Sequence, residues 1–474
     1  MTGGSRVTEA TSESEKKKPR LDANYWKLWT ASVISNVGDG IGAIAYPWIA
    51  SSVTRNGLLI AGIAIAQRLP WLVFTLPAGV ITDRFDRRKI MVLMDVIRAA
   101  LIGVMALIVF GRQEGLPTPD VIEQGLPFAE DLTLYWVLLV GALLLGFAEV
   151  LRDNTSQTIL PAIVDADDLE TANGRMWAAE VVSNSFIGPF VGAVLLGVAL
   201  SLPLGFDAVS FLLAAVLVAT MKGVFTPQRA DAAFEQRPNW KDEIREGFRW
   251  LRAHSVLWPM AIILGILNAA FAGQTAVFVL WAQEILGADA RILAYLGTGG
   301  AVGGVVGSVL AKRIAERAGS GTALAFTLVI MAVLPAFTGF LRDWWAVWVV
   351  IVIGSLASMV WNVITVSLRQ TIIPDDLLGR VNSVYRFFAW GMMPIGLLAG
   401  GLVMRGTEIF ANRDLALRMP YFVAAVVLTV VVVWAIPQLT TEKLEAARAA
   451  GIAAREQREA HKRHTAERDT TSDG

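Results

Sequence analysis

The stretch QTILP at residues 157–161 returns almost unchanged as QTIIP at residues 370–374 of a chain of 474 residues. Two further matches occur at nearly the same separation, Asn173 with Asn382 and GPFVG at residues 188–192 with MPIG at residues 393–396. Chance can supply one such match, but three matches in one register indicate that the two halves of the chain repeat one structural unit.

The composition indicates that this unit lies in lipid. Hydrophobic residues make up 55% of the chain, charged residues only 17%, and the mean hydropathy is +0.54, which is too apolar for an ordinary soluble domain. The 41 basic and 41 acidic residues balance, which excludes a global basic field of the kind that attracts nucleic acid. Cysteine is absent, which excludes disulfides, thiol nucleophiles and cysteine metal sites.

Apolar runs of roughly 18 to 25 residues follow one another between polar ends, and a helix of this length crosses about 30 Å of hydrocarbon. The runs lack the apolar and polar alternation of a membrane β-barrel. We therefore expect an all-α integral membrane protein with twelve transmembrane helices. The expected spans are residues 26–50, 57–80, 90–110, 134–152, 172–200, 203–221, 257–282, 291–311, 322–341, 345–368, 380–404 and 419–437.

Lysine and arginine predict the orientation of these spans. Connections on the side of the amino terminus carry 19 Lys and Arg residues, Arg152 among them, whereas connections on the opposite side carry seven. The positive-inside rule therefore predicts that both termini of this multi-pass protein lie in the cytoplasm. The richness in alanine, glycine and arginine indicates a bacterial source, so the expected location is the bacterial plasma membrane. Five tryptophans at outer ends of spans are expected to form an aromatic belt: Trp48, Trp136, Trp281, Trp344 and Trp345.

The repeated stretch lies just after the fourth span and again just after the tenth, so each half holds six spans in the same order. This arrangement predicts two six-helix bundles related by a pseudo-twofold axis. The expected domains are a disordered cytosolic tail at 1–25, an N-terminal bundle at 26–221, a cytosolic central loop at 222–256, a C-terminal bundle at 257–437, and a cytosolic tail at 438–474 that is partly helical or disordered.

The loop after the second span reads GVITDRFDRRKIM at residues 79–91. It resembles the signature loop of the major facilitator superfamily, Gly-x-Leu-Ala-Asp-Arg-x-Gly-Arg-Lys/Arg, with Asp86 at the position of the usual second glycine. Three other stretches resemble the third drug:proton antiporter branch of that family, which holds macrolide, tetracycline and enterobactin exporters. They are NVGDGIGAIAYP at 36–47, FDAVSFLL at 206–213 and RQTIIPDDLLGRVNSVYR at 369–386.

The resemblance covers roughly residues 25 to 440. It implies a monomeric secondary transporter without a cofactor, whose two bundles rock about a central pocket. The expected activity is export of small amphipathic drug-like or siderophore-like compounds by alternating access, with proton antiport. The expected partners are the small-molecule substrate, protons and the lipid bilayer. Two alternatives stay open, a metabolite facilitator that is uncoupled or differently coupled and a lipid-handling membrane protein.

The signature loop is expected to act as a cytosolic gate. Asp83 can face helix N-termini or arginines of the opposite half, whereas Arg87 and Arg88 can pair with Glu149 or Asp153 at the inner end of the fourth span. Such contacts would form in one state of the transporter and break in the other. The alternative is that the cations only set topology. The gate residues are Gly79, Asp83, Arg84, Arg87 and Arg88.

Charges inside the first two spans form a second candidate group, because each costs on the order of 2.5–3.5 kcal/mol at mid-helix unless it is paired or hydrated. Asp39 lies about 20 Å into the first span and Arg68 about 18 Å from the inner end of the second. Their similar depth predicts that they approach one another, directly or through water. Ser32, Asn36 and Asp39 share one face of the first span with Ser35, which predicts a polar stripe along a cavity.

The third and fifth spans add a further set of charges. Asp95 and Arg98 are one turn apart, and the depth of Arg98 places it near Glu180. Asn184 follows Glu180 by one turn. Buried carboxylates can take up and release protons, so the candidate carriers are Asp39, Glu180 and Glu149, in that order. The alternative is that these acids are static partners of Arg68 and Arg98.

The second half contains almost no acids at mid-membrane, and its aromatic residues predict an apolar wall of the substrate cavity. The expected cavity residues are Asn36, Asn184, Trp361, Asn362 and Trp390. Aromatic residues in membrane spans more often serve packing, and this reading stays open. Helix bends are expected at Gly188, Pro189 and Gly192, which resemble an antiporter motif, and at Pro394 of the second half.

Several other chemistries are excluded or disfavoured by the sequence. The stretch LGTGGAVGGVVGS at 296–308 lacks the preceding strand of a dinucleotide site, and its GxxxG spacings predict close helix packing. No GxxxxGK[ST] loop occurs, which disfavours ATP hydrolysis. His254 stands alone in the central loop, and no metal site or catalytic triad can be assembled around it. We therefore expect a transporter and not an enzyme.

Overall fold

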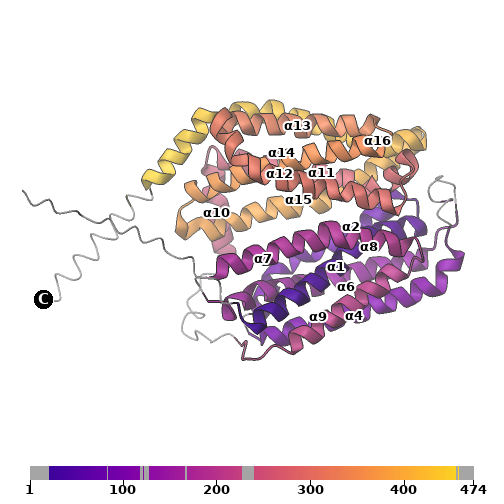
Figure 1. Cartoon of the computed structure of the whole chain (residues 1–474). Helices are drawn as coiled ribbons and strands as arrows, with labels where there is room; N and C mark the ends of the chain where they lie inside the picture. Colours follow the sequence, from indigo (N-terminus) through magenta and orange to yellow (C-terminus); the bar gives the residue numbers. More distant parts are fainter. Residues whose placement is uncertain are drawn as a thin grey trace, which may run out of the picture.

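The computed structural model describes residues 21–82, 84–117, 121, 128–165, 168–226, 240–454 and 457. Within these ranges the chain is helical apart from short connections, and no strand occurs (Figure 1). The predicted all-α fold is thus confirmed. Most of the predicted amino-terminal tail lies outside the described residues.

Among the described residues, the first half of the chain consists of long α-helices and two short ones, α3 and α8. These are α1 (Ala23–Val53), α2 (Gly57–Val73), α3 (Thr75–Thr82), α4 (Arg87–Arg112), α6 (Leu132–Ile159), α7 (Leu169–Val182), α8 (Gly188–Leu196) and α9 (Leu202–Ala219). A π-helical turn at Ser183–Ile187 joins α7 to α8 without a break. Side-chain caps start several helices: Asp22 accepts from the Tyr25 N–H and Asp86 from the Lys89 N–H.

The second half repeats this construction. It contains α10 (Trp240–Ala253), α11 (Leu257–Leu286), α12 (Ala290–Ala318), α13 (Ser320–Phe340), α14 (Trp344–Ile372), α15 (Asp375–Phe410) and α16 (Arg413–Ala435). Residues 441–454 add one more helix beyond α16. Gly287 closes α11 in the left-handed conformation, with φ of 60°, which glycine adopts without strain.

Every predicted span coincides with helix, and among the described residues 10 helices are long and apolar enough to cross a membrane. The first two predicted spans fall outside that set. α1 has 31 residues but carries Lys27 and Asp39, and α2 has only 17 residues before the chain turns at Phe74 into α3. The fold of a multi-pass membrane protein therefore stands, with ten of the twelve spans meeting the length and hydropathy of a crossing helix.

The same helix packing occurs in both halves. In the first half α1 packs on α8 and α9, α4 on α6 and α9, and α2 on α6. In the second half α11 packs on α15 and α16, α13 on α14 and α16, and α12 on α14, which is the same set of pairs shifted by six spans. Figure 1 shows the two halves as separate layers, and their interface follows the same symmetry, because α2 packs on α15 and α8 on α12.

Small residues bring helices together at these contacts. A Cβ placed on Gly57 of α2 would lie 2.4 Å from the Met404 sulfur of α15, and one on Gly401 would lie 3.1 Å from the Ala61 Cβ. On α12, a Cβ on Gly303 would lie 2.2 Å from the Val352 carbonyl oxygen of α14. The predicted close packing of the glycine-rich span is therefore confirmed.

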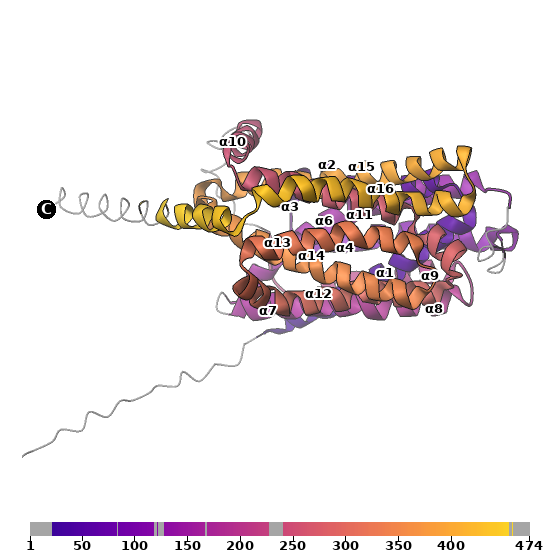
Figure 2. The same cartoon turned by 90° about the horizontal axis from the view of Figure 1, so that it is seen from above.

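The predicted aromatic belt is only partly correct. Trp136, Trp344 and Trp345 are exposed on the outside of the helices, as a belt requires. Trp48 and Trp281 are buried in the protein core instead, because the inner faces of α1 and α11 pack against neighbouring helices. α10 and residues 441–454 lie outside the layers of parallel helices, at the end of the molecule that the sequence places in the cytoplasm (Figures 1 and 2).

Candidate functional site

Five charged side chains form a continuous chain of ion pairs through the N-terminal bundle, which we call the charge chain. Asp39 of α1 accepts from the Arg98 guanidinium of α4 at 2.5 Å, and Asp95 lies 3.9 Å from the same guanidinium. Asp95 also lies 3.4 Å from Nε of Arg152 on α6, and Arg152 lies 3.6 Å from Asp153. Three helices that are distant in sequence are therefore linked by charge.

The two ends of the Asp39–Arg98 pair differ in their access to solvent. The Arg98 side chain is 4% exposed and lies over the Phe211 ring of α9, with its Cζ 3.7 Å from the ring centroid. The Asp39 side chain is 29% exposed. The Arg98 guanidinium is therefore buried between a carboxylate and an aromatic face, whereas the Asp39 carboxylate is partly exposed to solvent. Asp39 is thus the accessible end of the charge chain.

The carboxylate of Asp95 lacks hydrogen-bond partners within the part of the chain that the structure describes. Its side chain is fully buried, and neither carboxylate oxygen has a hydrogen-bond partner among the described residues. Its two arginine neighbours lie at ion-pair distance without hydrogen-bond geometry. A buried carboxylate in this condition responds strongly to any movement of its cations, because the low dielectric magnifies the change.

Two predicted pairings are corrected by this arrangement. Asp39 pairs with Arg98 and not with Arg68, which is exposed and forms no ion pair with a described residue. Arg98 in turn does not pair with Glu180, which is exposed on α7. Depth along the helices was similar for each predicted pair, but the rotation of each helix about its own axis decides which side chains meet.

Arg152 is a functional candidate that the sequence analysis assigned to topology alone. The predicted fourth span ended at residue 152, whereas α6 continues to Ile159, so Arg152 lies inside the helix and is buried. The signal was the adjacent Asp153 together with Asp95, the one acid of the third span. When a cation and an acid are adjacent at the end of an apolar run, they are better interpreted as buried charged residues of the span than as residues of a loop.

Asp207 of α9 is a second residue that the sequence analysis did not single out. It is buried, and its Oδ1 accepts a weak hydrogen bond from the Ser210 hydroxyl at 3.4 Å. A Cβ on Gly38 of α1 would lie 2.3 Å from that oxygen, so only glycine admits the carboxylate here. Electrostatic interactions connect Asp207 with Asp39 and Arg98. The position of Asp207 inside the apolar sixth span is the sequence feature that could have identified it.

Glu149 also borders the charge chain. It is half-buried on α6 and forms neither an ion pair nor a hydrogen bond with a described residue. Electrostatic interactions connect it with Asp39, Arg98 and Arg68. Of the three predicted carriers, Asp39 and Glu149 therefore lie together, whereas Glu180 lies at the margin of the same group.

A π-helical turn lies in the fifth span directly before the residues at which the sequence predicts a bend. Asn184 lies within this turn, directly before Gly188 and Pro189. A Cβ on Gly188 would lie 2.6 Å from the Gly40 Cα of α1, and one on Gly192 would lie 3.0 Å from the Ile41 carbonyl oxygen. The predicted close approach of these glycines is therefore correct. Helix segments of this kind occur often at functional sites.

The second half shows the corresponding approach near Pro394, which lies inside α15. A Cβ on Gly396 would lie 2.0 Å from the Ala269 carbonyl oxygen of α11. The α8 contact with α1 and the α15 contact with α11 are thus equivalent under the repeat, although α15 shows no π-helical turn among the described residues.

The predicted cytosolic gate has different partners from those expected. Arg88 donates to the Met221 carbonyl oxygen at 2.6 Å, and the Arg87 N–H donates to the Phe225 carbonyl oxygen at 3.3 Å. These contacts tie the start of α4 to the segment after α9 within one bundle, and neither arginine pairs with Glu149 or Asp153. The remaining gate residues are placed as follows: Gly79 is half-buried in α3, Arg84 is exposed, and Asp83 lies outside the described residues.

The predicted substrate-cavity residues differ in their burial and surroundings. Trp361 is only 3% exposed and packs in the core of the C-terminal bundle. Trp390 is 43% exposed and stacks on Trp71 of α2 across the bundle interface, with ring centroids 6.3 Å apart. Asn362 is exposed, and the half-buried Asn36 donates to the Ser32 carbonyl oxygen at 2.8 Å.

A second group of charges joins the two bundles at the end opposite the termini, and we call it the outer cluster. Arg55, after α1, donates to Glu284 of α11 at 2.5 Å and to Gln283 at 2.6 Å. Arg413 of α16 donates to Glu284 at 2.8 Å, to the Arg55 carbonyl oxygen at 3.0 Å, and to Glu408. From the sequence, Arg55 and Arg413 are only two of the seven cations in the outer connections, because their partners are far away in sequence.

Residues 28–397 match the Major Facilitator Superfamily. The chain is 23% identical to Macrolide efflux protein A of Streptococcus pyogenes over 393 residues, which cover 80% of this chain and 90% of that protein. It is 24% identical to Multidrug efflux pump Tap of Mycolicibacterium fortuitum over 416 residues, which cover 84% and 93% of the two chains.

Solved transporters share the fold at lower identity. A bacterial homologue of the iron transporter ferroportin in the inward-facing state superposes with a TM-score of 0.63 at 14% identity, covering 86% of this chain and 98% of that chain. The nucleoside transporter NupG superposes with a TM-score of 0.66 at 11% identity, covering 88% and 100%. The chain therefore belongs to the Major Facilitator Superfamily and is a multi-pass membrane transporter, not an enzyme.

Proposed function

We propose that this transporter exports small amphipathic compounds from the cytoplasm across the bacterial cell membrane, coupled to inward movement of protons. The observation that carries the proposal is the pairing of the partly exposed Asp39 with the buried Arg98. The named activities of the relatives, macrolide and multidrug efflux, support the export of drug-like compounds.

The coupling step begins with a proton on Asp39. Protonation removes the negative charge that neutralises Arg98, and a buried guanidinium cannot remain without a partner at low cost. Arg98 then has Asp95 one turn away on the same helix, and Glu149 and Asp207 within electrostatic reach. Re-pairing of Arg98 changes the contact between α1 and α4. We expect this change to bias the two bundles between their alternative arrangements.

We propose that the present conformation is closed on the outer side. The outer cluster joins α11 and α16 of one bundle to the α1–α2 connection of the other, and Glu284 is largely buried within it. Opening toward the outside would require Arg55 and Glu284 to separate. The outer side is the side opposite the termini, which the distribution of cations predicts to lie in the cytoplasm.

The substrate preference follows from the interface between the bundles. Trp71 and Trp390 present a stacked aromatic pair there, and the charge chain lies in the N-terminal bundle only. An apolar aromatic surface on one side and ionisable groups on the other suit a compound with a large apolar body and a cationic amine.

Transport by membrane vesicles tests the proposal. In inside-out vesicles with an acidified lumen, radiolabelled erythromycin is expected to accumulate, and accumulation should stop when nigericin collapses the pH gradient. Asp39→Asn should reduce the pH-driven accumulation to the level of vesicles without the transporter. Asp165→Asn removes an exposed acid of the same bundle and should leave accumulation intact.

Other outcomes identify the alternatives. Equilibration of erythromycin without accumulation, and without dependence on the gradient, would indicate a facilitator. Full pH-driven accumulation by Asp39→Asn would exclude Asp39 as the carrier and leave Glu149 as the next candidate.

A further inference from the structure

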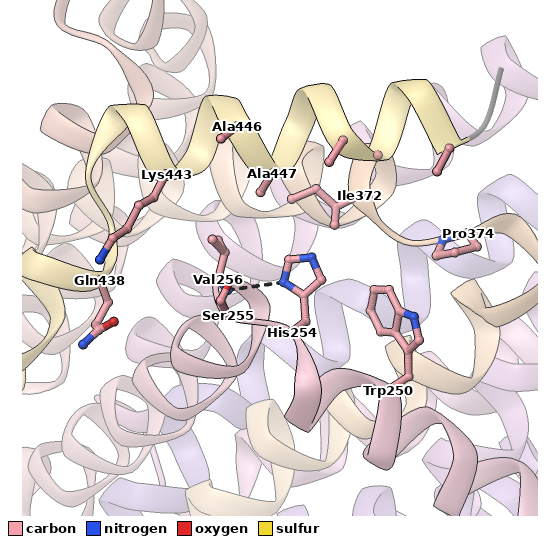
Figure 3. Close-up of a pocket in the computed structure, with 13 residues that line it drawn as sticks. Trp250, His254, Ser255, Val256, Ile372, Pro374, Gln438, Lys443, Ala446 and Ala447 are labelled. Carbon is pink, nitrogen blue, oxygen red and sulfur yellow. Dashed lines mark hydrogen bonds between the residues drawn. The ribbon is translucent and has the colours of Figure 1, made fainter. Parts of the chain in front are cut away.

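A cavity of about 570 Å³ lies at the predicted cytosolic face of the C-terminal bundle, away from the charge chain. It is open on one side and is bordered by the end of α10, residues 254–256 before α11, the end of α14 and the helix of residues 441–454 (Figure 3). Its volume lies within the range of about 300–1,000 Å³ that is typical of small-molecule sites. The transport function proposed above uses none of its residues.

His254 is the centre of this cavity. It separates α10 from α11, and its Nδ1 accepts from the N–H groups of Val256 and Leu257 at 3.3 and 3.2 Å. Since Nδ1 is the acceptor, the neutral ring carries its proton on Nε2 and can donate from there. Burial lowers the pKa of His254, so the neutral form prevails near neutral pH. Nε2 makes no hydrogen bond with a described residue, and in Figure 3 it faces the helix of residues 441–454.

The two long walls of the cavity form a slot. One long wall is formed by the His254 ring and, toward one end of the cavity, by the Trp250 ring, with ring centroids 5.4 Å apart. On the other side the helix of residues 441–454 presents small side chains beyond Lys443: Ala446, Ala447, Ala450, Gly451 and Ala454. Gly451 also permits the helix to dock, because a Cβ there would lie 2.8 Å from the Ile372 Cα. An aromatic wall facing a flat wall admits a planar ring.

The two ends of the slot differ in polarity. Figure 3 shows Lys443 and Gln438 at one end, Trp250 and Pro374 at the other, and His254 between them. The Lys443 ammonium donates to the Pro437 carbonyl oxygen at 2.6 Å and retains further donors. None of the described residues that line the slot is acidic. The local charge therefore favours an anion at the Lys443 end.

We propose that this slot is a binding site for a planar aromatic anion, such as an aryl carboxylate. The aromatic ring would lie between Trp250 and the alanine face, and the carboxylate would lie beside Lys443. A carbonyl or ether oxygen on the ring system would accept from His254 Nε2–H. The bound compound would join residues 441–454 to the junction of α10 and α11.

The test uses purified full-length protein in detergent micelles and the probe 6-fluoro-2-naphthoate, followed by ¹⁹F NMR line width with empty micelles as the reference. Ala450→Trp fills the slot and should weaken binding at least tenfold. Ala449→Trp is the matched control, because Ala449 is an exposed neighbour on the same helix that does not line the slot. It should bind the probe like the unmodified protein.

A second pair of variants tests the charge without changing the packing. Lys443→Gln should weaken naphthoate binding severalfold, whereas Lys312→Gln, at another exposed lysine, should not. The cationic analogue 6-fluoro-2-naphthylmethylamine should bind more weakly than naphthoate to the unmodified protein. Equal binding by Ala450→Trp and Ala449→Trp would overturn the proposal, and so would equal binding of the anion and the cation. Because binding is measured without transport, either result leaves the export proposal unaffected.

Discussion

The two bundles share their helix packing but not their interiors. The N-terminal bundle buries Asp95, Arg98, Arg152 and Asp207, whereas the buried charges among the described positions of the C-terminal bundle, Arg418 and the largely buried Glu284, lie near its outer end. The contacts between equivalent helices are nevertheless the same. Packing by small and apolar residues therefore maintains the repeat, while the ionisable chemistry is concentrated in one copy.

Arginine substitutions should show this difference most strongly. Arg152→Met leaves the fully buried Asp95 with only the Arg98 guanidinium at 3.9 Å, and we expect a loss of about 3–5 kcal/mol of stability together with loss of transport. Arg369 ends α14 in the other bundle and lies over the Tyr385 ring at 4.4 Å. Arg369→Met should cost roughly 0.5–2 kcal/mol.

Thermal unfolding in detergent would measure both costs. The double variant Asp95→Asn with Arg152→Met should recover part of the loss, because it removes the uncompensated carboxylate. Equal destabilisation by Arg152→Met and Arg369→Met would contradict the view that stability depends on buried charge pairs mainly in the N-terminal bundle.

Glycine substitutions should affect the two bundles alike, because the close approaches are shared. Gly188→Ala and Gly396→Ala each introduce a methyl group where a backbone atom lies within 2.6 Å or less, and each should destabilise the fold by about 1–3 kcal/mol. Gly205→Ala is the control, because no atom lies within 4 Å of its Cβ position, and it should be neutral or slightly stabilising. A large effect at only one of the two close contacts would show that the repeat is not equivalent there.

The outer cluster links the bundles, so its weakening should change conformation more than stability. Glu284→Gln removes the charge shared by Arg55 and Arg413, and we expect a several-fold gain in outward opening. The chain has no cysteine, so Asn36→Cys provides a single labelling position for a membrane-impermeant maleimide added from outside. Labelling should increase in Glu284→Gln and stay unchanged in Glu316→Gln, an exposed acid at the other end of the molecule.

The smallest effect is expected at a pair of helix caps on equivalent helices. Asp131 caps α6 by accepting from the Leu134 N–H at 3.0 Å, whereas Asp343 precedes α14 without a side-chain cap. Asp131→Ala should cost about 1 kcal/mol and Asp343→Ala less. The unfolding temperatures of the two variants measure this difference in stability, and equal shifts in the two variants would contradict the prediction.

The Asp131 cap should also depend on pH. Burial of the Asp131 carboxyl acts to raise its pKa, but hydrogen bonds from the Leu134 N–H and from Arg112 outweigh it, and the pKa is lowered. The cap therefore contributes its full stability above the unfolded pKa of about 3.9 and loses it as pH falls through the folded value. Asp131→Ala should remove that acidic pH dependence.

The sequence was sufficient for the fold but only partly for the site. Hydropathy and the repeat predicted the helix positions, since span length is imposed by the bilayer. Depth along each helix predicted that charges would meet, but it could not predict rotation, so Asp39 was assigned to Arg68 while it contacts Arg98. The contact of Arg55 with Arg413 depends on how the two bundles dock, and no local pattern contains that information.

The π-helical turn at Ser183–Ile187 has a mechanical consequence. One inserted residue turns the preceding helix by about 100° relative to an unbroken α-helix. Gly188 and Gly192 of α8 can thus keep their close contact with α1, while the π-helical turn sets the direction in which Glu180 of α7 points. Deleting a single residue from this turn would swing the face that bears Glu180 around the helix axis and leave the glycine contact in place.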